Sequence, residues 1–299
     1  MSMIGETLKG AEKILVALSE LGYLTVSQLT TLLYAPSSQS YVQKQLTSLT
    51  AAGYVMPLTH RFVTQPRVYT LTGKGQSALT SLGVRQQIRI RPTEEKAKAR
   101  NFLFVQHTIA VTDVLIAAKL LSQTVPDIQL TRMYLERELK RIIYVEIPEK
   151  VCIEPDAACE FEITVSADGT QHTAVDFFHI EVYRNLPPQE WRFKQKIAGY
   201  VTYALTGQHE ALFQTPALAL AVIAATDRQQ TTLKRWTEEA LQAMERPEEG
   251  EWFFFCSLDT ATTSPEELFL SPVWEQAFGT AKTPLIVLEE ETEEAQTNQ

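Results

Sequence analysis

Apolar residues recur every three or four positions in three successive stretches near the start of the chain. This spacing predicts three amphipathic helices, in residues 5–21, 25–34 and 36–52. Gly22 and Gly53 end the first and third helices, and Thr25 or Ser27 is available to cap the second. The inward-facing positions are Leu8, Ile14, Leu15, Leu18, Leu21, Leu29, Leu32, Leu33, Val42, Leu46 and Leu49.

The next stretch, "VMPLTHRFVTQPRVYTLTGKGQSAL", predicts a strand, a basic turn, a second strand and a helix that opens near Gly75. Three short helices followed by a β-hairpin is the order of a winged helix-turn-helix domain. The phrase "YTLTGKGQSAL" resembles the junction between wing and helix in bacterial winged-helix regulators. We therefore assign residues 1–84 to a winged helix-turn-helix DNA-binding domain.

The outward side of the third helix and the hairpin carry side chains suited to DNA. Small and amide side chains approach base edges, whereas tyrosine and lysine reach phosphates. Basic residues of a hairpin suit contact with the backbone or the minor groove. A winged helix that contacts only protein, with its charges solvated, is the alternative. The predicted DNA-binding residues are Ser38, Gln39, Ser40, Tyr41, Gln43, Lys44, His60, Arg61, Arg67 and Lys74.

Charge divides the chain near the same place. The net charge of −9 combines residues 1–100, with 12 Lys+Arg and 5 Asp+Glu (+7), and residues 101–299, with 15 and 31 (−16). A basic segment joined to an acidic segment indicates that only one domain of the chain binds a polyanion. Residues 85–101 are a basic linker, which either extends the phosphate contacts or only aids solubility. Residues 286–299 are predicted to form an acidic tail.

Residues 102–285 predict a second domain in which helices and strands alternate. A long helix in 102–123 precedes extended segments in 128–141 and 141–166 and a strand in 173–184. A helix in 188–205, the buried strand "PALALAVIAAT", a helix from Asp227 and the strand "WFFFC" complete the order. The fold class is α/β, or α+β for the whole chain. With no apolar run of about 18 residues and only three scattered cysteines, we expect a cytoplasmic protein without a membrane partner.

Two acids stand in "IEPDAACEFEI" and "FFHIEVYRN", an order that resembles the PD-(D/E)xK restriction-endonuclease-like fold. In such a nuclease, Asp156 and Glu181 would bind Mg²⁺ through oxygen, and a lysine would stabilise charge on the attacked phosphate. Tyr183 occupies the lysine position, and Lys194 or Lys196 in the next helix is the candidate replacement. The domain is therefore an active nuclease, a retained fold whose acids serve structure or binding, or an unrelated sheet. A buried ion pair of Glu181 with either lysine would suffice as a structural explanation.

The chain as a whole resembles the replication-relaxation family, bacterial proteins associated with plasmid copy control and mobile elements. The resemblance covers roughly residues 8–275 and rests on the order of short motifs: "YTLTGKG", an H-x5-D helix, the PD strand, an E-x-D strand, a K-x-x-x-Y helix and a late arginine-bearing helix. In this sequence the motif residues are His107, Asp113, Asp156, Glu181, Lys196 and Tyr200, and the chain departs from the family at Tyr183, where aspartate is frequent.

The resemblance implies a DNA-binding protein of a plasmid or other mobile element, acting in replication or transcription control. We expect double-stranded DNA as partner, a homodimer, and a catalytically inactive nuclease-like domain that mediates dimerisation or contacts a replication or transposition protein. No cofactor or catalytic residue is expected. Two alternatives stay open. One is a Mg²⁺-dependent endonuclease that uses Asp156 and Glu181 with Lys194 or Lys196; the other is a protein adaptor in a replication or transposition complex.

Overall fold

The computed structural model of the chain describes residues 9–58, 66–84, 102–143, 153–167, 170–184 and 189–288. It is a mixed α/β protein, as the sequence predicts. The chain divides into two compact units, residues 1–116 and 117–299, and the long helix α6 (Phe102–Thr124) crosses from one to the other. The predicted linker, residues 85–101, lies outside the described residues, as does nearly all of the predicted acidic tail.

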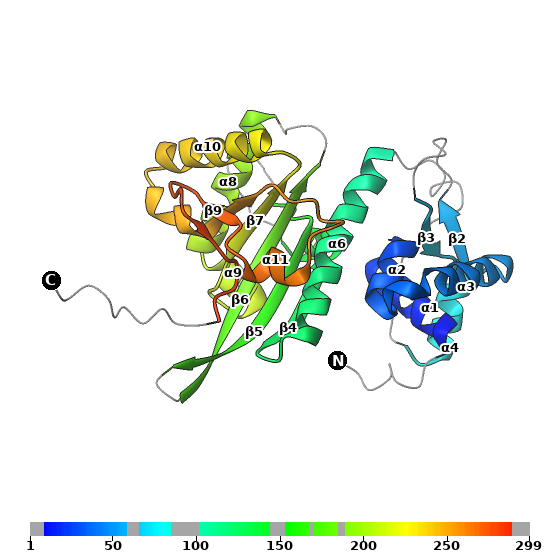
Figure 1. Cartoon of the computed structure of the whole chain (residues 1–299). Coiled ribbons are helices and arrows are strands. Elements are labelled where there is room, and N and C mark those ends of the chain that lie inside the picture. The colour runs from blue at the N-terminus through cyan, green and yellow to red at the C-terminus, as the bar shows by residue number, and fades with distance from the viewer. Residues whose placement is uncertain are drawn as a thin grey trace. The chain divides into compact units, whose positions relative to one another are not determined.

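The N-terminal unit contains three helices followed by two antiparallel strands and a fourth helix (Figure 1). A two-residue strand, β1, pairs with β3, so the small sheet has the order β1-β3-β2. Its elements are α1 (Gly10–Leu21), β1 (Leu24–Thr25), α2 (Val26–Leu33), the 3-10 turn Pro36–Ser38, α3 (Gln39–Ala51), β2 (Val55–Leu58), β3 (Val68–Leu71) and α4 (Gly73–Ser81).

Local signals set the ends of these helices. Gly22, with φ of 85°, ends α1, and Gly53, with φ of 76°, follows α3. Thr25 caps α2: its hydroxyl accepts from the backbone N–H of Gln28, and the Gln28 side chain accepts from the backbone N–H of Thr25. A Cβ on Gly75 would lie 2.2 Å from the carbonyl oxygen of Tyr54, so α4 approaches the α3–β2 turn at a distance that only glycine allows.

The C-terminal unit is built on a seven-stranded sheet of order β10-β9-β8-β7-β6-β5-β4. β6–β7 and β7–β8 are parallel, and the other pairs are antiparallel. Its elements are β4 (Ile128–Leu135), α7 (Glu136–Ile142), β5 (Ala157–Ala167), β6 (Thr170–Tyr183), α8 (Glu190–Leu205), α9 (Gln208–Phe213), β7 (Ala219–Ala224), α10 (Asp227–Ala243), the 3-10 turn Pro247–Trp252, β8 (Phe253–Cys256), α11 (Pro265–Leu270), β9 (Trp274–Gln276) and β10 (Lys282–Thr283).

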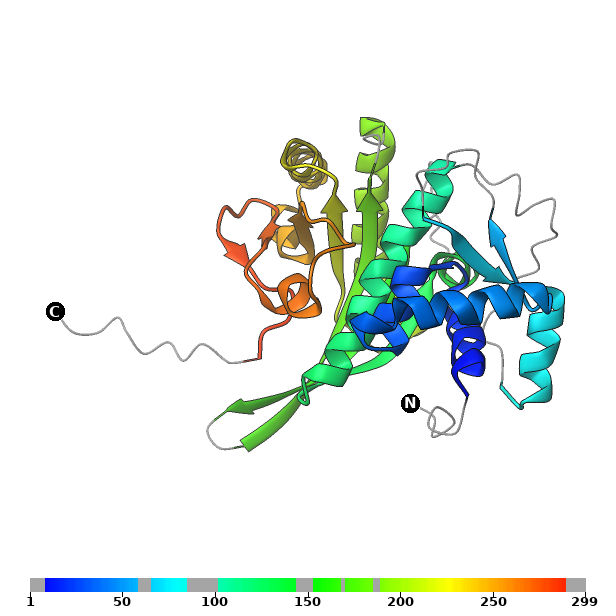
Figure 2. The ribbon, with the colours of Figure 1, turned by 45° about the vertical axis from the view of Figure 1, so that its right-hand side comes forward.

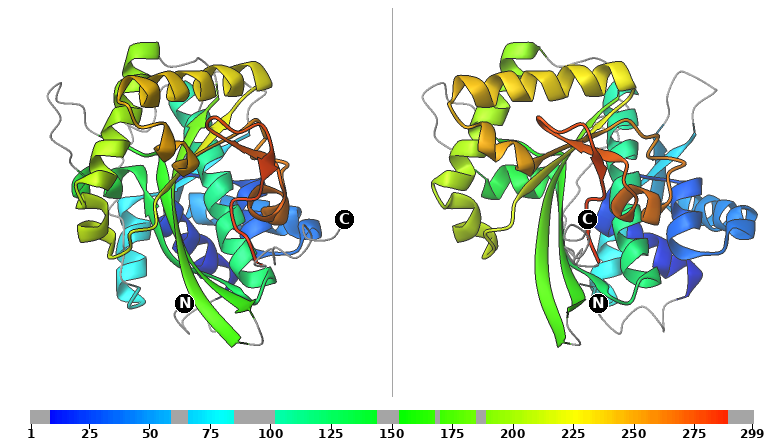
Figure 3. Two further views of the ribbon diagram at one scale, coloured as in Figure 1. Left: turned by 90° about the vertical axis from the view of Figure 1, so that its left-hand side faces the viewer. Right: turned by 60° about the vertical axis from the view of Figure 1, so that its left-hand side comes forward.

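Helices α8 and α10 cover one face of the sheet, as the right-hand view of Figure 3 shows. Their inward side chains, including Phe193, Tyr200 and Leu233, join Phe253 and Phe255 of β8 in the main hydrophobic core. Phe253–Cys256 of the "WFFFC" stretch therefore form a core strand, and Trp252 ends the preceding 3-10 turn. On the opposite face, Phe161 of β5 packs edge-on against Phe269 of α11, with ring centroids 5.3 Å apart.

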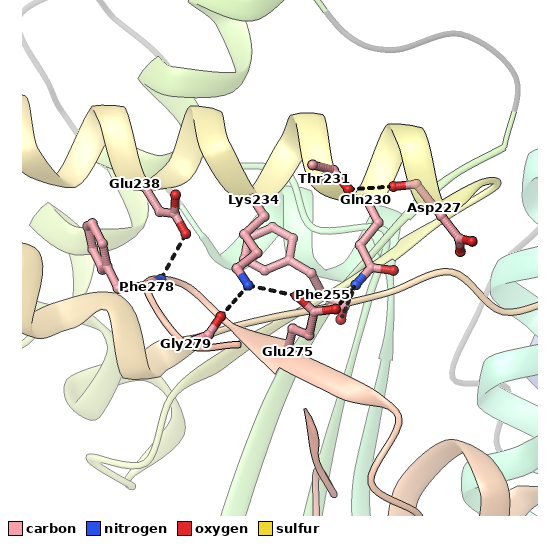
Figure 4. A network of polar contacts seen from close by, with 9 residues as sticks. All are labelled: Asp227, Gln230, Thr231, Lys234, Glu238, Phe255, Glu275, Phe278 and Gly279. Carbon is pink, nitrogen blue, oxygen red and sulfur yellow. Dashed lines mark hydrogen bonds and ion pairs between the residues drawn. The ribbon is translucent and has the colours of Figure 1, made fainter. Parts of the chain in front are cut away.

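A polar network holds β9 and the following turn to α10 (Figure 4). The Lys234 ammonium donates to Glu275 Oε2 at 2.7 Å and to the carbonyl oxygen of Gly279. The Gln230 amide donates to Glu275 Oε1 and to the carbonyl oxygen of Phe255, both at 3.3 Å. Because the Lys234 side chain is only 13% exposed, this pair is better shielded from solvent than a surface salt bridge.

Helix α7 corrects the prediction of an extended segment through residues 128–141, since only the first part is the strand β4. The side chain of Glu138 accepts from the backbone N–H of Leu135 at 3.0 Å, and Lys140 pairs with Glu136 one turn earlier at 2.7 Å. These local contacts stabilise a helical start where β-branched neighbours had suggested a strand.

Helix α6 is long and apolar enough to cross a membrane by length and composition, but half of its most apolar stretch is buried inside the protein. A core helix of a soluble protein passes the same test. Asp113 and Lys119 also interrupt its apolar sequence.

Candidate functional site

The exposed face of α3 is the first candidate site. Val42, Leu46 and Leu49 face inward and are buried, at the positions that the sequence predicts. The rest of the helix surface exposes Gln39, Ser40, Tyr41, Lys44, Thr47 and Ser48, while Ser38 at the N-cap and Gln43 are half-buried. This face is polar, carries no acid, and has one lysine in its middle.

Tyr41 is held in place at the start of α3. Its ring meets Tyr34 edge-on, with centroids 5.5 Å apart, and the Tyr34 hydroxyl donates to the carbonyl oxygen of Gly10 at 2.9 Å. A Cβ on Gly10 would lie 2.2 Å from the Tyr41 hydroxyl oxygen, so the glycine makes room for the tyrosine. Tyr41 nevertheless keeps 43% of its surface exposed. It therefore offers a fixed aromatic edge at this end of the helix.

Two of the predicted DNA-binding residues, Lys74 and Gln43, make hydrogen bonds inside the N-terminal unit. The Lys74 ammonium donates to the carbonyl oxygen of Ala52 at 2.8 Å and lies 4.8 Å from the ring centroid of Tyr54, so Lys74 caps the C-terminal end of α3. The Gln43 amide donates to the Tyr69 hydroxyl at 3.4 Å. Lys74 still places positive charge at the surface, but its ammonium also has a structural task.

Only part of the hairpin formed by β2 and β3 lies among the described residues. Arg67 is exposed just before β3. His60 and Arg61 lie outside the described residues. Of the predicted DNA-binding side chains, α3 therefore exposes Ser40, Tyr41 and Lys44 on its outward side and Gln39 at its first residue.

Sequence reasoning missed Gln28, which joins α2 to the first half of α6. Its side-chain amide donates to the carbonyl oxygen of Ile109 at 2.9 Å and to Asp113 Oδ1 at 2.8 Å. The same side chain accepts from the backbone N–H of Thr25, and Gln28 is 5% exposed. The Thr25–Gln28 spacing signals a helix cap, but no local pattern signals the partner 85 positions away in Asp113.

The second candidate site is a buried acidic centre at the C-terminal end of β6. Glu181 is 2% exposed. Its Oε1 contacts the Lys196 ammonium and accepts from the Tyr200 hydroxyl at 3.2 Å, while Oε2 accepts from the Tyr183 hydroxyl at 3.4 Å. Both carboxylate oxygens therefore have donors supplied by the protein.

Asp156 lies close enough to Glu181 for its charge to act on it. Asp156 Oδ2 accepts from the backbone N–H of Val182 at 2.8 Å, and its own N–H donates to the carbonyl oxygen of Ile180 at 3.0 Å. Burial raises the pKa of Glu181 to about 7; Lys196 opposes this rise, and Asp156 adds to it. Burial, followed by the charge of Glu181, raises the pKa of Tyr183 well above its ordinary value, so this tyrosine is a neutral donor.

Lys196, and not Lys194, contacts Glu181. Lys194 lies on the outer side of α8, where its ammonium pairs with Glu190 and with Glu239 of α10, both at 2.6 Å. Helical geometry explains the difference, because residues two apart on a helix point about 200° apart. The Glu181–Lys196 pair is the buried ion pair that the sequence left open between the two lysines.

Other acids of these strands lie elsewhere. Glu160 accepts from the Thr131 hydroxyl at 2.6 Å and pairs with Arg132 at 3.5 Å, and Asp176 lines a pocket beyond the end of β7. Within the described ranges, no group of three or more histidines, cysteines or acids could hold a metal ion. Asp156 and Glu181 are the residues that the nuclease alternative predicts as Mg²⁺ ligands.

His179, two residues before Glu181, is fully buried among aromatic rings. Its ring centroid lies 5.2 Å from that of Phe177 and 5.6 Å from those of Tyr200 and His209. Burial lowers the pKa of His179 well below its ordinary value, so the ring is neutral. These contacts make it a packing residue of the core under α8 and α9.

The arrangement of both units can now be compared with known proteins. A family model described as replication-relaxation matches residues 15–215, which is more than half of the chain. The chain belongs to the replication-relaxation family. Neither a curated protein nor a solved structure matches it. The matched residues include α3, the Gln28–Asp113 link and the acidic centre, and family membership supports a replication-related role.

Proposed function

We propose that this replication-relaxation protein binds duplex DNA of a plasmid or other mobile element and acts in replication or transcription control. The N-terminal unit would act as a winged helix-turn-helix domain, with α3 in the major groove and the β2–β3 hairpin as the wing. The observation that carries this proposal is the exposed face of α3, where Gln39, Ser40 and Lys44 lie together without an acid. Family membership supports the biological setting.

The side chains on this face have distinct tasks. Gln39 and Ser40, in the first turn of α3, would meet base edges, because the N-terminal residues of a recognition helix are the ones that read the groove. Lys44, one turn later, would meet a phosphate. Tyr41, fixed against Tyr34, would border the contact. Lys74 would add charge near the C-terminal end of α3 while it caps that helix.

A gel-shift titration against the DNA upstream of the gene, at several salt concentrations, tests the proposal. Lys44→Ala should weaken binding uniformly across sequences and reduce the slope of log K against log salt by about one. Gln39→Ala should instead relax sequence preference, at a cost of about 1–3 kcal/mol. The matched control is Lys282→Ala, which removes an exposed lysine of the C-terminal unit. DNA binding that responds equally to Lys44→Ala and Lys282→Ala would reject α3 as the contact.

We further propose that the C-terminal unit is a nuclease-like scaffold that does not cut DNA and serves dimerisation or contact with a replication or transposition protein. The supporting observation is that Lys196, Tyr200 and Tyr183 already contact both oxygens of Glu181. A metal ion would have to compete with these donors for the same carboxylate oxygens. The protein would act in the cytoplasm, where such DNA lies.

The rival function is a Mg²⁺-dependent endonuclease. One observation favours it: two acids and a lysine come together, since burial, and with it the charge of Asp156, raises the pKa of Glu181 and the Lys196 ammonium contacts the Glu181 carboxylate. Incubation with supercoiled plasmid and Mg²⁺ or Mn²⁺ distinguishes the two functions. Nicking that is lost in Glu181→Gln would establish the enzyme. Nicking that persists in that variant comes from another source, and an intact plasmid supports the scaffold.

A further inference from the structure

Strands β5 and β6 continue beyond the rest of the sheet as a two-stranded arm. β4 pairs with β5 only as far as Ile163, and β7 pairs with β6 only from Phe178 onward. Beyond these limits β5 and β6 pair with each other out to Ala167 and Thr170. Figures 2 and 3 show the arm reaching away from the other strands. We define the arm as residues 164–167 and 170–177.

The arm has an open edge along β6. Among the residues that the structure describes, none pairs with the stretch from Thr170 to Phe177 on the side away from β5. A strand edge presents backbone N–H and C=O groups that can pair with another strand. A two-stranded ribbon is also only marginally stable alone in water, and a third or fourth strand stabilises it.

Among the described residues, the β6 edge lacks the usual protection of an edge strand. Folded proteins block such edges with lysine, proline, bulges or a covering segment. The sequence of the edge, "TQHTAVDF", contains neither lysine, arginine nor proline, and its one acid, Asp176, stands near its end. His172, Thr173, Ala174 and Val175 are all exposed. The edge is therefore neutral along most of its length and accessible to a strand.

Two hollows lie at the base of this edge. A pocket of about 430 Å³ has Val175 in its wall, together with Arg132 and Phe213. A second pocket, of about 410 Å³, has Asp176 and Trp252 in its wall. Because Val175 and Asp176 are neighbours in a strand, their side chains point to opposite faces of the sheet. Pro216 and Ala217 line both hollows, so the two hollows lie side by side at the base of the edge, where a strand added to it would reach them.

We propose that the β6 edge of the arm pairs antiparallel with the same edge of a second copy of this chain, which makes one continuous sheet across a twofold axis. A second copy fits because the edge is almost neutral, so no partner of opposite charge is called for, and because two identical antiparallel edges satisfy one another's backbone groups. This proposal deepens the proposed function, since twofold DNA sites are bound by symmetric dimers.

Symmetry restricts the register. Residues paired across an antiparallel ladder point to the same face, and a twofold axis perpendicular to the sheet keeps each residue on its own face. One residue must therefore lie opposite its own copy. The two central residues of the edge are Thr173 and Ala174, and setting Thr173 opposite Thr173 of the second copy keeps the two Asp176 carboxylates farther apart. This register places Asp176 opposite Thr170.

Sedimentation of the full chain over a range of concentrations tests the interface. The wild-type chain should dimerise, and Thr173→Lys should raise the dissociation constant at least about tenfold, because two lysines would face each other across the axis. Thr262→Lys, which adds the same charge at an exposed turn, should leave dimerisation unchanged. A chain that stays monomeric, or one that dimerises equally well with either substitution, overturns the proposal.

Cysteine cross-linking tests the register. Under mild oxidation, Thr173→Cys should give a covalent dimer, because directly opposed Cα atoms lie within about 6 Å of each other. The wild-type chain and Thr262→Cys, treated alike, should give little. A cross-link at Thr262→Cys but not at Thr173→Cys would overturn the register and the arm contact together. The proposed function can fail independently: a chain that dimerises through the arm but binds no duplex DNA, or binds it equally well after Lys44→Ala, contradicts the role of α3 alone, and the arm proposal then stands.

Discussion

The buried Glu181 should make the stability of the C-terminal unit depend on pH in an unusual direction. Burial raises the pKa of Glu181 in the folded chain to about 7, from an ordinary value of 4.5. Between these two pH values the folded chain therefore binds more protons than the unfolded chain. The free energy of unfolding should then fall as pH rises through this window, which is opposite to the behaviour of a carboxylate stabilised in its charged form.

The size of the effect follows from the displacement of the pKa. At about 1.4 kcal/mol for each pH unit, a displacement from 4.5 to about 7 corresponds to about 3 kcal/mol. Glu181→Gln removes the titrating group and keeps the shape. The advantage of wild type over this variant should therefore shrink by about 3 kcal/mol from pH 4.5 to pH 7.5. Asp176, whose pKa burial raises to about 6, adds an effect of the same sign to both chains and cancels in the comparison.

Urea unfolding followed by tryptophan fluorescence is a suitable assay. All four tryptophans (Trp191, Trp236, Trp252 and Trp274) belong to the C-terminal unit, so the signal reports that unit alone. The control is Glu190→Gln, which alters an exposed ion pair of α8 and should show no such trend. A difference between wild type and Glu181→Gln that stays constant from pH 4.5 to 7.5, or grows with pH, would refute the reasoning. Glu181 would then be held in its charged form by Lys196.

Three further predictions concern packing and hydrogen bonding. Gly75→Ala should lower the free energy of unfolding of the N-terminal unit by about 1–3 kcal/mol, measured by thermal unfolding, because the added Cβ meets the Tyr54 carbonyl oxygen; unchanged stability would show that α4 shifts freely. Gln28→Ala should cost about 1–3 kcal/mol by removing the hydrogen bonds of the buried Gln28 amide to the Ile109 carbonyl oxygen and to Asp113, and faster amide exchange in α6 should accompany it. Lys234→Met should cost about 1–3 kcal/mol by removing its bonds to Glu275, seen as a lower urea midpoint in the tryptophan signal.

Much of the N-terminal unit follows from local signals. Helical spacing placed Val42, Leu46 and Leu49 in the core, and Thr25 and Gly53 mark helix ends, because a cap and an amphipathic face need only neighbours within about one turn. The same kind of local signal also explains an error. The β-branched composition of residues 128–141 predicts a strand throughout, but the capping contact at the start of α7 and the Glu136–Lys140 ion pair favour a helix.

The sequence by itself determined the α/β class, the polar outer face of α3, and Asp156 and Glu181 as candidate acids, because each depends on residue type and short spacing. Only the tertiary structure decided that Lys196 and not Lys194 meets Glu181, that Lys74 caps α3, and that Gln28 binds Asp113. It also decided where β4 and β7 stop along β5 and β6, and so left the arm with an open edge. These outcomes depend on contacts between residues far apart in the chain, whose geometry no local pattern encodes.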